Sequence, residues 1–385
     1  MYIIFFDYNN KKGSTMSEDL KAYKWLVSSC LQKSIRRGRF DLAEPYVKFL
    51  WEHDRSYITY RFGTVLTEDV GIANPELVSK YLDTKLAKKQ IDAKGGVDFF
   101  LELTKEACES AKDRSSCDAA YLAQYFSLNL NNKAEAEKLF NDTNANYIDR
   151  INAGWSLLGG KKFKTENLNF LNPVTEPATD DIEYYVNQVE KMTNTLTANL
   201  VKNAYATQVE NICLGIPIIE SLYQKEIIDT AEKKFKAGRI IENTYVKEEV
   251  FFHKETGLDL ISCGMDGHTR EGKSVYYNFL KSKQDFTAYM NEQKVPFEKH
   301  IDLFLHSMFR TEGHEVNKRI YFPTAVTVMR DCEEKVLNFK ADLPQGTLNF
   351  ATIKEILIDA MPTINHMKRE SLSKSQANSF IKRKF

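Results

Sequence analysis

The chain has 385 residues, a hydrophobic content of 43%, and 53 basic residues against 53 acidic ones. This length and apolar content predict two or three folded domains and exclude a largely disordered chain. The zero net charge excludes nucleic-acid binding through a global positive field, so any such contact must come from a local basic patch.

The six cysteines are scattered and include no Cys-x-x-Cys pair. This pattern predicts neither a disulfide framework nor a zinc site, and it is typical of a reduced cytoplasm. No segment approaches the roughly 20 apolar residues of a membrane-spanning helix, so we expect no membrane partner. The apolar run at residues 2–6 lacks the basic flank and cleavage site of a signal peptide, and residues 1–16 are interpreted as an N-terminal extension.

Residues 17–130 are predicted to form a helical domain. Apolar residues recur there at intervals of three and four, as in Leu42, Tyr46 and Phe49, which is typical of helices that pack along one side. Residues 131–181 are rich in Asn, Lys, Thr, Gly and Pro, which predicts a linker with loop structure and a domain boundary.

Helical periodicity returns in residues 182–370, which we interpret as a second, mostly helical domain with a few short strands. The interruption at residues 215–217, Gly-Ile-Pro, is compatible with two helices or with one kinked helix. Two β-prone runs on either side of Gly257 predict a small hairpin or an irregular connection. Residues 371–385 are expected to form a basic tail. The predicted fold class is therefore mainly α.

Residues 25–78 contain two pieces that identify a family. The first is a predicted helix with Ser29, Lys33, Ser34, Ile35 and Arg36, and the second is the turn at 68–75, Glu-Asp-Val-Gly-Ile-Ala-Asn-Pro. In order and spacing these pieces resemble the C-terminal helical collar of the MgsA/RarA type of clamp-loader-like AAA+ ATPases. The likeness covers residues from about 20 to 125. It implies a collar-like helical bundle in the N-terminal third.

In that family the collar joins subunits, while an N-terminal domain hydrolyses ATP. The resemblance therefore implies an accessory of DNA replication or repair that forms homo-oligomers and binds DNA, a clamp, a polymerase or other AAA+ replication proteins. No counterpart of the ATPase domain precedes Trp25, so the resemblance does not imply hydrolysis by that domain. A collar joined to an unrelated half is expected of a phage or mobile-element protein. A module that docks on another protein's collar is a further interpretation.

The turn at 68–75 also has a purely structural interpretation. Gly71 can adopt the left-handed conformation that ends a helix, and Pro75 fits the first turn of the next one.

A basic run occupies the end of the first predicted helix. Lys33, Arg36 and Arg37 share one face there, and Arg39 follows. These four residues are candidates for DNA phosphate contacts, and the alternative is a solvated helix end whose dipole favours cations. The same alternatives apply to the basic residues near the C-terminus, Lys368, Arg369, Lys374, Lys382, Arg383 and Lys384.

Residues 267–274, Gly-His-Thr-Arg-Glu-Gly-Lys-Ser, match the phosphate-binding pattern G-x-x-x-x-G-K-[ST] between a strand-like and a helix-like segment. In this interpretation Lys273 reaches the phosphates of ATP and Ser274 holds magnesium, which defines the alternative function, a nucleotide-dependent enzyme. The bulky loop interior and the interrupted Walker B candidate ending at Asp331 argue against it. The candidate phosphate or ligand-binding residues are Asp266, Gly267, His268, Thr269, Gly272, Lys273 and Ser274.

The same segment also fits a structural corner, in which Asp266 or Thr269 caps the following helix and His268 makes a fixed hydrogen bond. No catalytic residue and no metal site is predicted, because His253, His268 and His314 are each more typical of a surface histidine or a hydrogen-bonded buried one than of a metal ligand. The first hypothesis is therefore a non-catalytic accessory without a cofactor, and ATP and magnesium belong only to the alternative.

Overall fold

The computed structural model describes residues 20, 23–86, 90–126, 128, 130, 132–158, 182–207, 210–231, 239–241, 249–282, 285–313 and 315–375. The predicted N-terminal extension, residues 159–181 of the predicted linker, His314 and residues 376–385 of the predicted tail lie outside this part of the chain.

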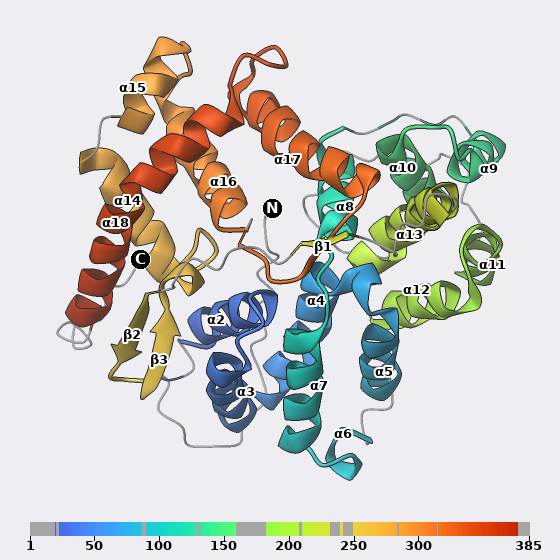
Figure 1. Cartoon of the computed structure of the whole chain (residues 1–385), viewed down its shortest axis with the longest axis horizontal. Coiled ribbons are helices and arrows are strands. Elements are labelled where there is room, and N and C mark those ends of the chain that lie inside the picture. Colours follow the sequence, from blue (N-terminus) through green and yellow to red (C-terminus); the bar gives the residue numbers. More distant parts are fainter. Residues whose placement is uncertain are drawn as a thin grey trace. The chain divides into compact units, whose positions relative to one another are not determined.

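The described residues are mainly α-helical, as the sequence predicts, and Figure 1 labels their helices and strands. In the first half of the chain the elements are α2 (Lys24–Arg36), α3 (Phe40–His53), α4 (Arg55–Asp69), η1 (Gly71–Ala73), α5 (Pro75–Leu86), α6 (Gln90–Ala93), α7 (Val97–Glu109), α8 (Ser115–Tyr125), α9 (Lys133–Asn141), α10 (Tyr147–Leu157) and α11 (Ile182–Met192).

In the second half they are α12 (Thr195–Thr207), α13 (Glu210–Ala231), β1 (Arg239–Ile241), β2 (Val250–His253), β3 (Leu258–Ile261), η2 (Ser262–Gly264), α14 (Arg270–Ser282), α15 (Asp285–Glu292), η3 (Phe297–Lys299), α16 (His300–Gly313), β4 (Arg319–Tyr321), α17 (Pro323–Ala341) and α18 (Phe350–Ser375). None of these helices is long and apolar enough to cross a membrane.

The chain divides into two compact units, each assembled from segments that are distant in sequence. Unit 1 consists of the described residues within Thr59–Asn243 and Asn317–Cys332, and unit 2 of those within Asn10–Ile58, Thr244–Val316 and Glu333–Phe385. The predicted helical domain at 17–130 is therefore divided inside α4. Composition could not predict this division, because contacts between remote helices determine it.

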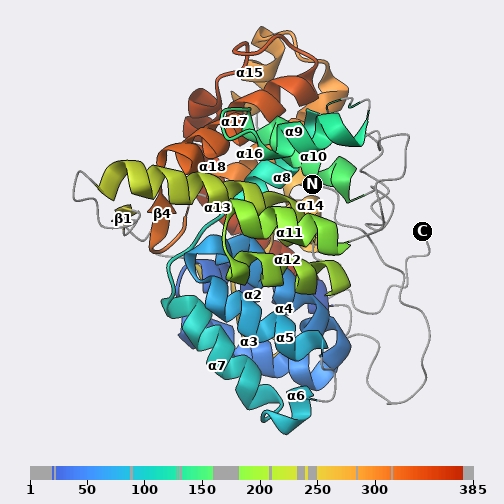
Figure 2. The same cartoon turned by 90° about the vertical axis from the view of Figure 1, so that its right-hand side faces the viewer.

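Unit 1 is a helical assembly in which α8 packs on α13, and α12 packs on both α5 and α13. Figure 2 shows α11, α12 and α13 side by side. Part of its core is an aromatic cluster, in which the ring of Phe62 lies 5.2 Å from both the ring of Tyr81 and that of Phe100. The packing of these rings against one another removes apolar surface from water. This hydrophobic effect is the main force that holds such helices together.

The first half of the predicted linker is helical, which corrects the prediction of loop structure there. Helices α9 and α10 occupy it, and each begins at an asparagine. The side chain of Asn132 accepts a hydrogen bond from the backbone N–H of Glu135, and that of Asn146 accepts one from Ile148. Asparagines that read as loop residues by composition therefore act as helix caps.

Helix α13 continues through Pro217 as one helix, which decides between the two alternatives for residues 215–217. The short strands β1 and β4 pair antiparallel in unit 1, an association that the sequence did not predict.

In unit 2, α2 packs on α3, while α14, α16 and α18 contact one another. The predicted hairpin is present, since β2 and β3 pair antiparallel (Figure 1). The ring of Phe304 on α16 lies 5.6 Å from Tyr276 and 5.1 Å from Phe286, which gives this unit its own aromatic core.

Candidate functional site

The corner between β3 and α14 holds most of the candidate ligand-binding residues, and its local structure is a helix cap. The side chain of Asp266 accepts a hydrogen bond of 2.9 Å from the backbone N–H of His268. The hydroxyl oxygen of Thr269 accepts one of 3.0 Å from the N–H of Gly272. Thr269 thus caps α14, which is what the structural interpretation of this segment predicts.

The cap and the first turn of α14 use several of the backbone N–H groups that a phosphate-binding loop would present to its ligand. The N–H of Thr269 donates to the carbonyl of Asp266, and the N–H of Lys273 donates to the carbonyl of Thr269. Because phosphate cradles rely on N–H groups that are left open, the segment does not have the geometry of such a cradle. The geometry therefore gives no support to a nucleotide site.

The four residues that the pattern fixes have separate positions. Gly272 is buried, and a Cβ atom there would overlap the backbone of Asp266, so this glycine permits a close approach of the helix to the corner. Lys273 and Ser274 lie exposed on α14. Gly267 packs against Leu305. The two glycines of the pattern therefore have packing reasons, and its lysine and serine lie on the surface.

The Walker B candidate is not a strand. Residues 325–331 lie in α17, where the carboxylate of Asp331 accepts a hydrogen bond of 2.7 Å from the hydroxyl of Tyr147. A nucleotide site needs this aspartate at the end of a strand near the phosphates. The helix replaces that arrangement with a buried structural contact.

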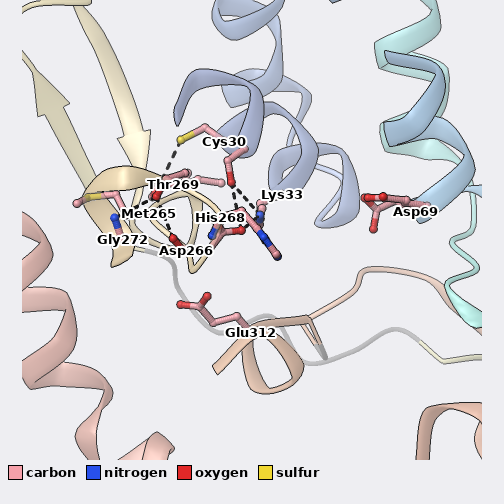
Figure 3. Close-up of polar contacts among 12 residues, drawn as sticks. Cys30, Lys33, Asp69, Met265, Asp266, His268, Thr269, Gly272 and Glu312 are labelled. Atoms are coloured by element: carbon pink, nitrogen blue, oxygen red, sulfur yellow. Dashed lines mark hydrogen bonds and ion pairs between the residues drawn. The ribbon is translucent and has the colours of Figure 1, made fainter. Parts of the chain in front are cut away.

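The structure joins the two candidate clusters that the sequence presented separately. The ammonium of Lys33 on α2 forms an ion pair with the carboxylate of Asp266, and both side chains are almost fully buried. Lys33 also donates a hydrogen bond of 2.8 Å to the hydroxyl of Ser29. Figure 3 shows Lys33 pointing at Asp266 across the corner. The ion pair links residues 233 positions apart in sequence, a separation that no sequence pattern reports.

The charge of Lys33 controls the protonation of Asp266. Burial by itself would raise the pKa of this carboxyl, but the nearby Lys33 ammonium and His268 bring the pKa well below its ordinary value. Asp266 is therefore ionised throughout the neutral range, and a buried ionised carboxylate requires such a cation beside it.

A second buried ion pair lies in the same unit. Glu312 on α16 accepts a hydrogen bond of 2.9 Å from the ammonium of Lys368 on α18, and the hydroxyl of Tyr276 lies 3.3 Å from both of its carboxylate oxygens. Burial raises the pKa of Glu312, and the charge of Lys368 opposes this shift. Burial and the charge of Glu312 also raise the pKa of Tyr276.

We call Lys33, Asp266, Tyr276, Glu312 and Lys368 the unit 2 charge network. It ties α2, the corner, α14, α16 and α18 together through side chains that all have partners. Such a network specifies how these helices pack.

The basic run on α2 does not form an exposed patch. Lys33, Arg36 and Arg37 are only 4%, 1% and 3% exposed. Arg37 forms an ion pair of 2.6 Å with Glu315, and the more exposed Arg39 forms one of 2.6 Å with Asp41. Carboxylates thus cancel the positive field that DNA phosphates would need, and the burial does not favour these residues as a DNA contact.

The basic residues near the C-terminus have mixed positions. Lys368 is buried in the charge network, and the guanidinium of Arg369 lies 2.7 Å from the carboxylate of Glu249. The side chains of Lys374, Lys382, Arg383 and Lys384 lie outside the described residues.

Sequence reasoning missed Glu312, Tyr276 and Lys368 as members of this network. One signal could have found Lys368, because it lies four residues after Ile364 and four before Leu372, and both of these are buried. A cation at helical spacing between two core residues indicates a buried charge with a partner.

Unit 1 has its own polar cluster at the turn that carries the family resemblance. Gly71 has a φ of +50°, the left-handed conformation that the sequence predicts. Asp69 forms a buried ion pair of 2.6 Å with Arg114. Its carbonyl also accepts a hydrogen bond of 3.1 Å from the N–H of Asp113. The turn is thereby fixed to the segment that precedes α8.

Asp113 lies fully buried beside this turn. Its carboxylate accepts hydrogen bonds from the backbone N–H groups and the hydroxyls of Ser115 and Ser116. Burial raises the pKa of Asp113, and these neutral donors oppose the shift only in part.

The histidines form no metal centre in the described part of the chain, where no group of three or more His, Cys, Asp or Glu side chains could hold a metal ion. The ring of His268 lies 5.2 Å from that of Phe309 at an edge-on angle. The buried His253 contacts Thr256 and Glu255. Each of these two rings therefore has a structural role.

Comparisons with protein-family models, with curated proteins and with solved structures find no match to this chain. The collar resemblance of residues 25–78 therefore stays a prediction.

Proposed function

We propose that this protein is a non-catalytic accessory of DNA replication or repair that acts by oligomerisation and by binding DNA, a collar-bearing protein or another replication protein. The support from sequence is the resemblance over residues 25–78. The support from structure is that these residues form helices, with the apolar residues of α2 and α3 buried in unit 2 and those of α5 in unit 1.

One observation carries the proposal over the enzymatic alternative. The polar groups of the corner itself are engaged in internal contacts, since Asp266 pairs with Lys33 and Thr269 caps α14. A site for group transfer needs open donors aimed at a ligand, and this corner uses them to hold the protein together. Association through helical surfaces needs no such site.

Size-exclusion chromatography with light scattering tests the proposal directly. We expect the full chain either to elute above its monomer mass of 44.4 kDa or to form a complex with a collar-bearing AAA+ protein. Runs with and without single-stranded DNA separate self-association from DNA-dependent assembly. A strict monomer that binds neither DNA nor a collar-bearing partner would overturn the proposal.

The enzymatic alternative has its own measurement, the retention of labelled ATP on filters by the purified protein. We expect no retention above background. The informative pair of variants is Lys273→Ala and Lys48→Ala, because Lys48 is an exposed lysine outside the pattern. ATP binding that Lys273→Ala abolishes and Lys48→Ala preserves would favour the nucleotide-dependent enzyme instead.

A further inference from the structure

The outer face of α14 is basic and carries an exposed aromatic residue. The inner face is apolar and buried through Val275, Tyr276 and Phe279. The outer face contains only polar, basic and aromatic side chains, and all of them are exposed: Arg270, Lys273, Ser274, Tyr277, Asn278, Lys281 and Ser282.

Four of these residues form one row along the helix. Arg270, Lys273, Tyr277 and Lys281 follow one another at intervals of three, four and four residues, which places them on one side of an α-helix. At a rise of about 1.5 Å per residue the row is about 16 Å long. A row of this shape can follow one strand of a flexible polyanion.

The positive charge of this face is largely uncompensated. In the described part of the chain, no carboxylate lies within ion-pair distance of Lys273 or Lys281. Arg270 contacts Glu271 at 3.0 Å, but its own side chain is 79% exposed. An exposed pair of this kind is weak and remains open to competition from a ligand. The face is thus a local basic patch on a chain without net charge.

Tyr277 distinguishes this face from an ordinary solvated helix surface. Its side chain is 53% exposed, and the ammonium of Lys281 lies 4.2 Å from its ring centroid. A single exposed ring is common on protein surfaces, but this ring lies between Lys273 and Lys281 in the same row. Rings flanked by cations are the platforms on which proteins stack unpaired bases while they neutralise the phosphates.

We propose that the outer face of α14 binds single-stranded nucleic acid, with Lys273 and Lys281 at backbone phosphates and Tyr277 stacked on a base. This inference deepens the proposed function and rests on it for the biological setting. An acidic protein segment would use the lysines but would have no base to place on the ring, and duplex DNA keeps its bases stacked inside.

The test measures the fluorescence anisotropy of a labelled oligothymidylate titrated with the full chain at several salt concentrations. The variant Lys273→Gln/Lys281→Gln removes two phosphate contacts and keeps good helix formers. Because each contact on a single strand contributes about 0.7 to the slope of log K against log salt, we expect the slope to fall by about 1.4. The charge-matched control Lys48→Gln/Lys254→Gln removes two exposed lysines of unit 2 outside α14 and should leave the slope unchanged.

A second variant isolates stacking from charge. Tyr277→Leu keeps an apolar side chain but removes the ring, and we expect oligothymidylate binding to weaken at least about 5-fold, the lower end for loss of one stacked base. The control Phe252→Leu removes another exposed aromatic ring of unit 2, on β2, and should have no effect. Circular dichroism of all the variants shows that α-helix content is retained.

The possible outcomes separate the inference from the proposed function. Absence of oligonucleotide binding in a protein that still self-associates overturns the inference alone, and a monomer that binds no partner and no oligonucleotide overturns both. Competition by polyglutamate equal to that by unlabelled oligothymidylate, or equal binding of duplex and single strand, also overturns the inference. A parallel titration with labelled oligouridylate compares RNA with DNA, and a preference for either one supports the inference.

Discussion

Asp113 in unit 1 and Asp266 in unit 2 have similar positions but opposite protonation behaviour. Both are fully buried, both precede a helix, and both accept backbone N–H bonds near its start. Burial raises the pKa of Asp113, whereas Lys33 reverses the effect of burial and lowers the pKa of Asp266.

The difference shows what decides the charge of a buried carboxyl. Neutral donors such as the hydroxyls of Ser115 and Ser116 only partly replace the water that burial removes. A buried ammonium adds a charge–charge attraction that is strong where water is excluded. The carboxylate of Asp266 therefore depends on a cation, while the carboxyl of Asp113 depends on hydrogen bonds.

The largest expected effect comes from removing the cation. Lys33→Met leaves Asp266 buried without its partner, and we expect the free energy of unfolding to fall by about 3–5 kcal/mol, measured by urea denaturation. In an Asp266→Asn background the same substitution should cost clearly less, because no charge is then stranded. Equal costs in the two backgrounds would show that the ion pair contributes nothing to stability.

A smaller loss is expected from Gly272→Ala. The added Cβ atom would overlap the carbonyl of Asp266, so α14 must move away from the corner, and overpacking of this kind costs about 1–3 kcal/mol. Ser274→Ala, at an exposed position on the same helix, serves as the control and should change stability by less than about 0.5 kcal/mol. A Gly272→Ala protein as stable as the control would mean that the corner is looser than the structure indicates.

The pH dependence of stability should differ between the two carboxyls. The pKa of Asp266 in the folded protein lies below its ordinary value of 3.8. Its contribution to the free energy of unfolding is therefore present above pH 3.8 and is lost as the pH falls through the folded pKa. The pKa of Asp113 in the folded protein is raised. Its contribution to the free energy of unfolding is therefore present below pH 3.8 and is lost as the pH rises through the folded pKa. Neither slope can exceed about 1.4 kcal/mol per pH unit.

Urea denaturation of Asp266→Asn and Asp113→Asn across acid to neutral pH measures both slopes. The stability advantage of the wild type over Asp266→Asn should shrink as the pH falls below 3.8. Asp113→Asn should gain stability relative to the wild type as the pH rises above 3.8. Slopes of the same sign would contradict the contrast between the two units.

The smallest effect concerns the cap of α14. Thr269→Ala removes the acceptor of the Gly272 N–H and should destabilise the protein by about 1 kcal/mol, measured by thermal unfolding. Thr269→Ser keeps the hydroxyl and should retain most of that stability. If serine and alanine are equally destabilising, the lost contact is the methyl group and the cap is not important.

Local features were largely predictable from the sequence. The helical class, the hairpin at β2 and β3, the left-handed Gly71 and the cap at Thr269 all depend on residues a few positions apart. The prediction of a linker was wrong over α9 and α10, because Asn132 and Asn146 serve as caps, and composition does not distinguish a cap from a loop.

The pattern at residues 267–274 shows why a letter match is a weak guide to function. The sequence could not reveal that Lys33 would pair with Asp266, since the two lie on segments that only folding brings together. It could not show either that Lys273 would be exposed on the outer face of α14, because that depends on which face of the helix the rest of unit 2 covers.

The sequence by itself determined the mainly α class, the cap of α14, the hairpin and the absence of net charge, because periodicity and turn chemistry act over short distances and charge is fixed by composition. Only the tertiary structure decided the division into two units, the burial of the basic run of α2 and the pairing in the charge network. These depend on contacts between helices that are remote in sequence, and each contact is selected by the packing of the whole unit.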